Sequence, residues 1–251
     1  MIERVREIAV DASKFILEIY HQQDLTVETK SDNSPVTKAD LVSHDFITNA
    51  LAQSFPYPVL SEENPVPYEE RKSWDTYWLV DPLDGTKNFL ARDGQFTVNI
   101  ALVRSTVPVF GVVHVPVLDE TFFAEKGKGA FVCRNGEVLK ISNESTREDL
   151  VCAVSCFHDS EASQRFRSEH GITHIRKFGS SLKLCKLAEG EVDVYPRLEG
   201  TKEWDTAAAQ CIVEEANGKV LDITTGKPLV YNKPEIRNNH FIASRNDLTF
   251  L

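Results

Sequence analysis

Two aspartates that stand three residues apart carry the clearest chemical signal in the sequence. The segment Y-W-L-V-D-P-L-D-G-T-K-N-F contains Asp81 and Asp84, followed directly by Gly85 and Thr86. Its first four residues are apolar and β-rich, which predicts a buried strand. We expect the strand to end at Asp81, because Pro82 has no N–H group and cannot continue the pairing. Two carboxylates beside a glycine and a hydroxyl at a strand end favour a hard cation such as Mg²⁺, with room for a phosphate.

The same motif has a simpler structural interpretation. Asp-Gly is a common hairpin-turn dipeptide, and an aspartate before a proline is an ordinary boundary between a strand and a turn. The motif alone therefore leaves a metal site and a plain turn as alternatives.

Three further places put carboxylates at the edge of a predicted element. Asp40 and Asp205 each precede an apolar helical run, and Glu62 and Glu63 follow a short apolar strand. Each place has an alternative: the two aspartates would be good helix N-caps, and the two glutamates could be solvated loop residues. Only their combination with Asp81 and Asp84 favours a shared site.

The elements that would position these residues follow from hydrophobic periodicity. Apolar residues at helical spacing predict a helix over residues 2–21, and a second helix follows Asp40. The polar segment 24–35 has no periodicity and is expected to be a mobile loop. Runs separated by turn residues predict an antiparallel meander with strands at 97–103, 109–115, 120–124 and 130–133. From about residue 150 the sequence alternates between strands (151–155, 172–178, 192–195 and 219–221) and helices (160–170, 180–189 and 205–217), which indicates an α/β half.

A chain of 251 residues can form one large domain or two smaller ones. The change of pattern predicts a boundary near residue 145. Residues 1–145 would form an α+β half with most of the metal ligands, and residues 146–251 an α/β half with Asp205 and the specificity residues. We expect the active site in the cleft between the halves, where ligand sites are common.

Composition limits the classes of partner. The chain has 28 Lys and Arg against 38 Asp and Glu, a net charge of −10, which makes a nucleic-acid polymer an unexpected partner. Small phosphorylated molecules remain possible ligands, since metal ions supply positive charge locally. Charges throughout the N-terminal segment predict neither a secretory signal nor a membrane span. Five cysteines without a C-x-x-C pair predict reduced core residues rather than disulfides or a zinc site.

Taken together, the motifs resemble a known family. The strings S-E-E, W-L-V-D-P-L-D-G-T-K-N-F and W-D-T-A-A resemble the Mg²⁺-dependent, lithium-sensitive phosphatases related to inositol monophosphatase and fructose-1,6-bisphosphatase. D-N-S-P-V-T-K-A-D, the lysine after D-G-T, T-V-N-I-A-L, G-S-S-L-K and Y-P-R are similar to the 3′(2′),5′-bisphosphate nucleotidase branch. The resemblance covers nearly the whole chain. It implies an α/β (α+β) fold, the layered αβαβα sandwich, and hydrolysis of adenosine 3′,5′-bisphosphate to AMP and phosphate.

The resemblance also implies a set of metal ligands. One Mg²⁺ would be bound by Glu62, Asp81 and the backbone carbonyl of Leu83. A second would be bound by Asp81, Asp84 and Asp205, and a third, looser ion would lie near Glu62. Two or three cations would reverse the sign of a carboxylate cluster that by itself would repel phosphate.

Catalytic roles are implied in the same way. The hydroxyl of Thr86, bonded to Asp40, would orient and deprotonate the attacking water. Backbone N–H groups of Gly85 and Thr86, opening a short helix, would bind phosphate oxygens. Glu63 would support the ligands from behind without binding metal.

Substrate recognition is assigned mainly to the second half of the chain. By resemblance, Ser180, Lys183 and Arg197 would contact the 5′-phosphate and ribose, with His158 near the adenine. The alternatives are a solvated helix lysine and an ordinary loop histidine, and the sequence does not show that Lys183 and Arg197 converge. The remaining residues expected around the substrate are Glu62, Gly85, Thr86, Lys87 and Asp205.

The first hypothesis is therefore a Mg²⁺-dependent phosphomonoesterase acting on adenosine 3′,5′-bisphosphate and on its 5′-phosphosulfate relative. An inositol or sugar phosphate phosphatase is the alternative within the same chemistry. A non-catalytic phosphate-binding protein is the alternative of another class, and the intact pair of Asp40 and Thr86 argues against it. A cytoplasmic location is expected, with loose association with the inner membrane and the oligomeric state both left open.

Overall fold

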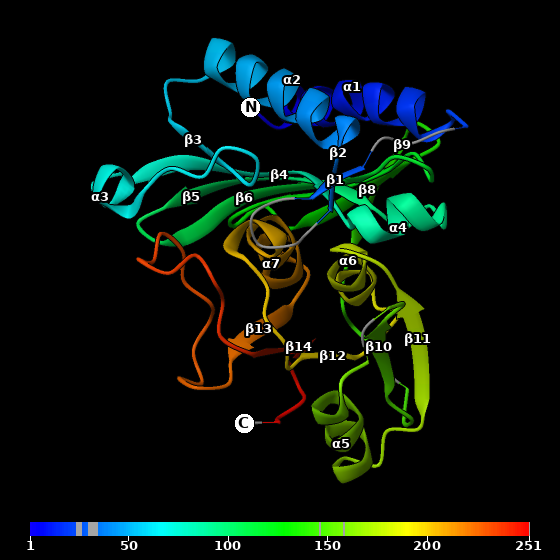
Figure 1. The fold of residues 1–251 in the computed structure, drawn as a ribbon. Helices are drawn as coiled ribbons and strands as arrows, with labels where there is room; N and C mark the ends of the chain where they lie inside the picture. The colour runs from blue at the N-terminus through cyan, green and yellow to red at the C-terminus, as the bar shows by residue number, and fades with distance from the viewer. Residues whose placement is uncertain (24–26, 30–34, 146, 158, 251) are drawn as a thin grey trace.

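The structure is a computed structural model that describes residues 1–23, 27–29, 35–145, 147–157 and 159–250. Figure 1 shows five stacked layers of helix and sheet. Helices α1 (Ile2–Tyr20) and α2 (Lys38–Ser54) cover the outer face of a seven-stranded sheet. Helices α6 (Leu182–Ala188) and α7 (Ala207–Glu215) lie between this sheet and a five-stranded one, and α5 (Glu161–Glu169) covers the far side. The predicted αβαβα sandwich is confirmed.

The first sheet has the strand order β3-β4-β5-β6-β7-β8-β9. Its strands are β3 (Val59–Ser61), β4 (Thr76–Asp84), β5 (Thr97–Arg104), β6 (Val107–Val115), β7 (Glu120–Glu125), β8 (Ala130–Arg134) and β9 (Glu137–Ile141). All neighbours are antiparallel except β3 and β4, so the predicted meander is confirmed. The sequence did not predict β9, which is mostly exposed at the sheet edge and lacks a buried face.

Alternation along β4 explains how one sheet joins two helical layers. Trp78 and Val80 are buried in the core with α1 and α2, whereas Tyr77 and Leu79 are buried in the core with α6 and α7. Successive strand residues point to opposite faces, so a strand buried on both sides is continuously apolar. A Cβ atom on Gly111 of β6 would lie 2.2 Å from the carbonyl oxygen of Ala208, so only glycine permits this approach of α7.

The second sheet has the order β11-β10-β12-β14-β13. Its strands are β10 (Val151–Ser155), β11 (His174–Phe178), β12 (Val194–Arg197), β13 (Gly218–Asp222) and β14 (Phe241–Arg245). The unpredicted β14 pairs antiparallel with both β12 and β13. The change of sheet falls between β9 and β10, close to residue 145. That the two halves are separate domains stays a prediction.

The segment after α1 differs in part from the expected loop. Strand β1 (Val27–Thr29) pairs antiparallel with β2 (Pro35–Thr37). The prediction of a loop is therefore wrong for residues 27–29 and for Pro35, because two short strands can pair through their backbones without hydrophobic periodicity. That the segment is mobile stays a prediction. Residues 24–26 and 30–34 lie outside the described residues.

Strand β4 does not end where the sequence predicted. It continues through Pro82 to Asp84, and its pairing with β5 shifts register between Asp81 and Asp84. The shift is a β-bulge, and a bulge tolerates proline because the ladder hydrogen bonds are interrupted there. The expectation that Pro82 stops the strand is wrong for this reason.

All five cysteines are free. Cys152, Cys185 and Cys211 are buried, as the sequence predicted, whereas Cys133 and Cys156 are only half-buried. Among the described residues, no helix has both the length and the apolar character needed to cross a membrane.

Candidate active site

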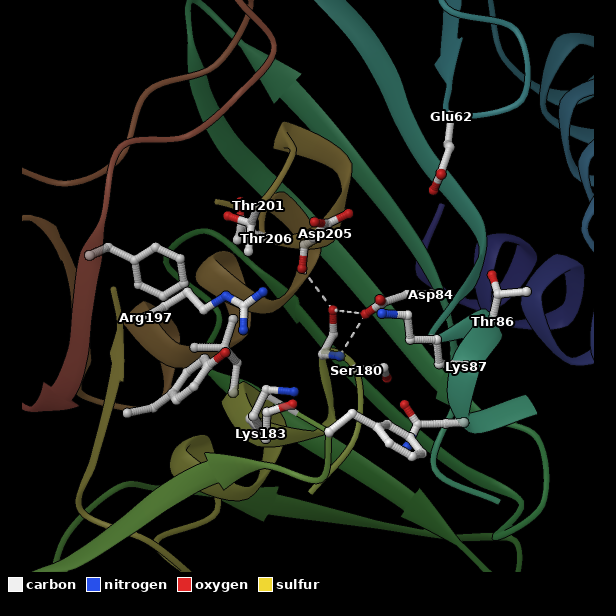
Figure 2. A pocket seen from close by; sticks show the side chains of 18 residues that line it. Glu62, Asp84, Thr86, Lys87, Ser180, Lys183, Arg197, Thr201, Asp205 and Thr206 are labelled. Atoms are coloured by element: carbon white, nitrogen blue, oxygen red, sulfur yellow. Dashed lines mark hydrogen bonds between the residues drawn. The ribbon is translucent and has the colours of Figure 1, made fainter. Parts of the chain in front are cut away.

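A cavity of about 210 Å³ brings together residues from both halves of the chain. Figure 2 shows the side chains that line it. They come from the turn after β3, the end of β4, the start of α4 (Thr86–Ala91), the end of β10, α6 and the turn before it, β12, the turn before α7 and the start of β14. The sequence-predicted residues among them are Glu62, Asp84, Gly85, Thr86, Lys87, Ser180, Lys183, Arg197 and Asp205. His158 lies outside the described residues.

Three carboxylates form a tight cluster at one end of the cavity. Oxygen atoms of Glu62, Asp81 and Asp205 all lie within 4.8 Å of one another. Burial and the neighbouring carboxylates, first Glu62 and then Asp84, raise the pKa of Asp81 well above its usual value. The pKa of Asp205 is also raised well above its usual value, first by burial and then by the charges of Asp84 and Glu62. Such a donor set of hard oxygen atoms fits a divalent cation, which would remove the repulsion that raises both pKa values.

The bulge in β4 places Asp84 beside this cluster. Residues three apart on a regular strand point to opposite faces. Asp81 pairs with Asn99, and Asp84 pairs with Thr97. The step from Asp81 to Asp84 is therefore three residues along β4, whereas the step between their partners is two residues along β5. The extra residue returns Asp84 to the face of Asp81, so the D-P-L-D spacing is suited to a bulge.

Ser181 ties Asp84 to the turn of Asp205, and the sequence analysis missed it. Its backbone N–H donates to Asp84 Oδ2 at 2.6 Å, and its hydroxyl lies 2.8 Å from the same oxygen. The hydroxyl also lies 2.7 Å from the carbonyl oxygen of Asp205, and it accepts from Asn99 Nδ2 at 2.9 Å. Ser181 is the second serine of the motif G-S-S-L-K, so the motif contained a signal for it.

Asp40 and Thr86 are in contact at the N-terminal end of α2. Thr86 Oγ1 donates to Asp40 Oδ1 at 3.3 Å. The other oxygen, Oδ2, accepts from the backbone N–H of Thr37 at 2.8 Å and from its hydroxyl at 2.6 Å. Thr37 is the N-cap of α2 and Asp40 is the third helical residue of a capping box. The N-cap alternative for Asp40 is therefore wrong, because the carboxylate caps from within the first turn.

Asp205 is likewise not an N-cap of α7. It ends the 3₁₀ turn η1 (Glu203–Asp205), and its Oδ2 accepts from the backbone N–H of Lys202 at 2.8 Å. This bond orients the carboxylate toward Glu62 and Asp81.

The backbone after Asp81 makes a sharp turn into α4. Leu83 is buried, and its N–H donates to Asp81 Oδ1 at 3.1 Å. Gly85 precedes the helix with φ of +95°, a conformation that favours glycine. The N–H groups of the first turn of α4 therefore begin beside the carboxylates. Glu63 is half-buried in the turn that carries Glu62.

Figure 2 shows Lys183 and Arg197 on the side of the cavity away from Glu62, which makes that end cationic. Lys183 is only 6% exposed, so the alternative of a solvated helix lysine is wrong. Burial lowers the pKa of Lys183 to about 8, and its Nζ lies 5.6 Å from the centre of the Tyr195 ring. Arg197 also lines this part of the cavity, and its Nη2 donates to the Gly200 carbonyl at 3.4 Å. Lys183 and Arg197 thus line one cavity, although the sequence did not show it.

Ser180 lies between the two ends. Its hydroxyl is 3.0 Å from that of Thr97, and its φ is +41°. Several cavity residues were not predicted, because they adjoin the motifs or come from distant elements: Asn88, Ser155, Phe157, Leu184, Tyr195, Thr201, Thr206 and Phe241. The roles assigned to the sequence-predicted residues remain predictions.

Comparison with known proteins defines the class. The model of the inositol monophosphatase family matches residues 1–248, and the chain belongs to this family. The family predicted from the motifs is confirmed.

Individual relatives narrow the comparison. The chain is 41% identical over 239 residues to the 3′(2′),5′-bisphosphate nucleotidase CysQ of Escherichia coli K12, covering 94% of this chain and 95% of that protein. It is 41% identical over 248 residues to the protein of the same name from Haemophilus influenzae, covering 96% and 91%. Among solved structures, CysQ from Bacteroides thetaiotaomicron is 36% identical with a TM-score of 0.88, covering 98% of this chain and 97% of that one. The predicted resemblance to the nucleotidase branch is confirmed.

Proposed function

We propose that this protein is a Mg²⁺-dependent phosphomonoesterase that removes the 3′-phosphate of adenosine 3′,5′-bisphosphate, releasing AMP and phosphate. The observation that carries the proposal is the chemical polarity of the cavity. One end collects carboxylates suited to cations, and the other presents Lys183 and Arg197. A substrate with two phosphates fits both ends, with its reacting phosphate beside the carboxylates. The nucleotidase relatives support this assignment.

The acidic end is where Mg²⁺ would bind. Glu62, Asp81, Asp84 and Asp205 would provide carboxylate oxygens, and Leu83 its backbone carbonyl. The bound cations would neutralise the cluster, stabilise negative charge on the phosphoryl oxygens and acidify water. Ser181 would keep Asp84 in place through its two contacts with Oδ2.

Thr86 and Asp40 would activate the water nucleophile. Because the Thr86 hydroxyl donates to Asp40 Oδ1, its lone pairs remain to accept a hydrogen bond from water. The two bonds from Thr37 fix the carboxylate of Asp40, so Oδ1 is in position to receive the threonine proton as Thr86 takes one from water.

Phosphate oxygens would be held by the backbone at the start of α4. The turn at Gly85 would direct the first N–H groups of this helix toward the cavity, which Gly85 and Thr86 both line. Lys87 lines the same cavity and would add positive charge. This segment would therefore orient the phosphate relative to the attacking water.

The cationic end would select the nucleotide. Lys183 provides a point charge and Arg197 a planar fork for the 5′-phosphate, with Ser180 nearby. An anion beside Lys183 would raise the pKa that burial has lowered. The 5′-phosphosulfate analogue would be accepted through the same contacts, since it carries an anion at that position.

The test is phosphate release from adenosine 3′,5′-bisphosphate, inositol 1-phosphate and fructose 1,6-bisphosphate, each with Mg²⁺ and with a chelator. We expect a strong preference for the nucleotide, abolished by chelation. Preference for inositol phosphate would leave the catalytic assignment and reject the roles of Ser180, Lys183 and Arg197. Release from none of the three would favour the binding-protein alternative.

A further inference from the structure

The turn that carries Asp205 is anchored by a buried glutamate outside the cavity lining. Glu203 is fully buried, two residues before Asp205. Its Oε2 accepts from the backbone N–H of Asn232 at 2.8 Å. Its Oε1 accepts from the backbone N–H of Lys233 at 3.0 Å and from Lys233 Nζ at 2.7 Å. A buried carboxylate with three donors defines one arrangement of the groups around it.

These contacts belong to a longer pairing between the turn 201–206 and the segment 231–238. The N–H of Glu203 donates to the carbonyl of Ile236 at 3.0 Å, and the N–H of Asn238 donates to the carbonyl of Thr201 at 2.8 Å. The amide of Asn238 donates to the carbonyl of Lys202 at 2.9 Å, and Lys233 Nζ donates to Asn238 Oδ1 at 3.2 Å. The turn is therefore held by both backbone and side-chain bonds.

The same turn sets the direction of the Asp205 carboxylate. Lys202 donates its N–H to Asp205 Oδ2 at 2.8 Å, and Asp205 donates its own N–H to the Lys202 carbonyl at 3.2 Å. The N–H of Thr206 donates to the Glu203 carbonyl at 3.2 Å. A movement of Glu203 would thus shift the carboxylate that must approach Glu62 within 4.8 Å.

The segment 231–238 is also joined to the first half of the chain. Arg71, only 1% exposed, ends the short helix α3 (Tyr68–Arg71), which lies in the connection between β3 and β4. Its Nη1 donates to Asn232 Oδ1 at 2.7 Å, and its Nη2 donates to the Lys233 carbonyl at 2.8 Å. Glu62 lies in the same connection, so the segment 231–238 is bonded both to the connection that carries Glu62 and to the turn that carries Asp205.

We propose that Glu203 is a positioning residue, which acts through Lys233 and the 231–238 segment to hold Asp205 at the correct distance from Glu62 and Asp81. The inference rests on the proposed metal-dependent function of the cluster. Residues that hold metal ligands in place without binding the metal commonly contribute about 10–100-fold to metal affinity or activity. Glu203→Gln keeps the volume and one acceptor but removes the charge opposite Lys233.

The experiment measures Mg²⁺ affinity by calorimetry for the wild type, Glu203→Gln and Glu235→Gln, at a temperature well below each melting temperature. Glu235 is an exposed residue of the same segment and provides the matched control. We expect Glu203→Gln to weaken Mg²⁺ binding about tenfold or more, with a matching rise in the Mg²⁺ concentration for half-maximal hydrolysis. The control should behave as wild type.

Unchanged Mg²⁺ affinity in folded Glu203→Gln, whatever its melting temperature, would overturn the proposal and leave a purely structural role. If this variant does not fold, Lys233→Gln is measured instead. It keeps the backbone donors to Glu203 and should weaken Mg²⁺ binding in the same direction, and wild-type affinity there would also overturn the proposal. A wild-type protein without Mg²⁺-dependent hydrolysis would reject the proposed function itself, which the variants do not address.

Discussion

Lys183→Met should make the protein more stable and a poorer enzyme. Lys183 is buried at the cationic end of the cavity, and its Nζ makes one long hydrogen bond, 3.4 Å, to the Phe178 carbonyl. Asp84 and Asp205 act on its charge from a distance, but among the described residues no carboxylate forms an ion pair with Lys183, so its charge lacks a direct counterion. Methionine has a similar shape and no charge, and replacing buried charges by apolar groups is often stabilising.

The magnitude follows from the pKa of Lys183. Burial lowers it from 10.5 to about 8. Below pH 8 the lysine is protonated in both states, and this shift corresponds to about 3 kcal/mol of lost stability. Between pH 8 and 10.5 the unfolded chain binds more protons than the folded one, so the contribution of this group to stability rises with pH. Loss of the contacts to Phe178 and Tyr195 offsets part of the gain. We expect Lys183→Met to be about 1–3 kcal/mol more stable at pH 7 and the advantage to disappear near pH 10.5.

Urea unfolding at pH 7 and pH 10.5, in the presence of a chelator, measures both values. Lys177→Met is the matched control, because Lys177 is exposed on neighbouring β11 and should show little difference at either pH. Lys183→Met should also lose about 1.5–3 kcal/mol of binding to the bisphosphate, seen as a higher KM. Destabilisation at pH 7, or an advantage that does not change with pH, would refute the argument that burial of this charge is costly.

Further predictions concern the reacting groups. Asp84→Asn should lower kcat by orders of magnitude through loss of a metal ligand, and an unchanged rate with weakened ligand binding would point to a binding protein. Thr86→Val should lower kcat about 10²–10⁴-fold with little change in KM, while Thr86→Ser, which keeps the hydroxyl, should retain most activity. Gly85→Ala should lower the free energy of unfolding, measured in urea, more than Gly127→Ala does. Both glycines have positive φ, but the Cβ added at Gly85 would lie 3.0 Å from Ser180 Cβ, whereas the one added at Gly127 would meet no atom within 4 Å. The KM of the wild type for the bisphosphate should rise above pH 8 as Lys183 loses its proton, and the KM of Lys183→Met should lack this alkaline limb.

The motifs were sufficient to predict the family and the members of the acidic cluster. Glu62, Asp81 and Asp205 were selected from residue type and from their position at element ends, and the structure brings their oxygens within 4.8 Å. Alternation and periodicity likewise located the meander and the first two helices. Such signals are local, because an element with a buried face requires apolar residues at a fixed spacing.

The sequence was less informative where the structure depends on long-range pairing. β14 is a five-residue strand between β12 and β13, and its sequence shows no sign of either partner. Pro82 was interpreted as the end of a strand because the register of β5 against β4 could not be known. Ser181 was missed because its contact with Asp84 joins residues 97 positions apart.

The sequence by itself therefore determined the family, the layered fold and the residue types of the acidic cluster. Tertiary structure decided the bulge that turns Asp84 toward Asp81, the burial of Lys183 and the buried bonds of Glu203. The physical reason is that side-chain chemistry and local backbone preference are encoded in short segments. Burial, pKa and the distance between two charges are properties of segments that meet only when the chain folds.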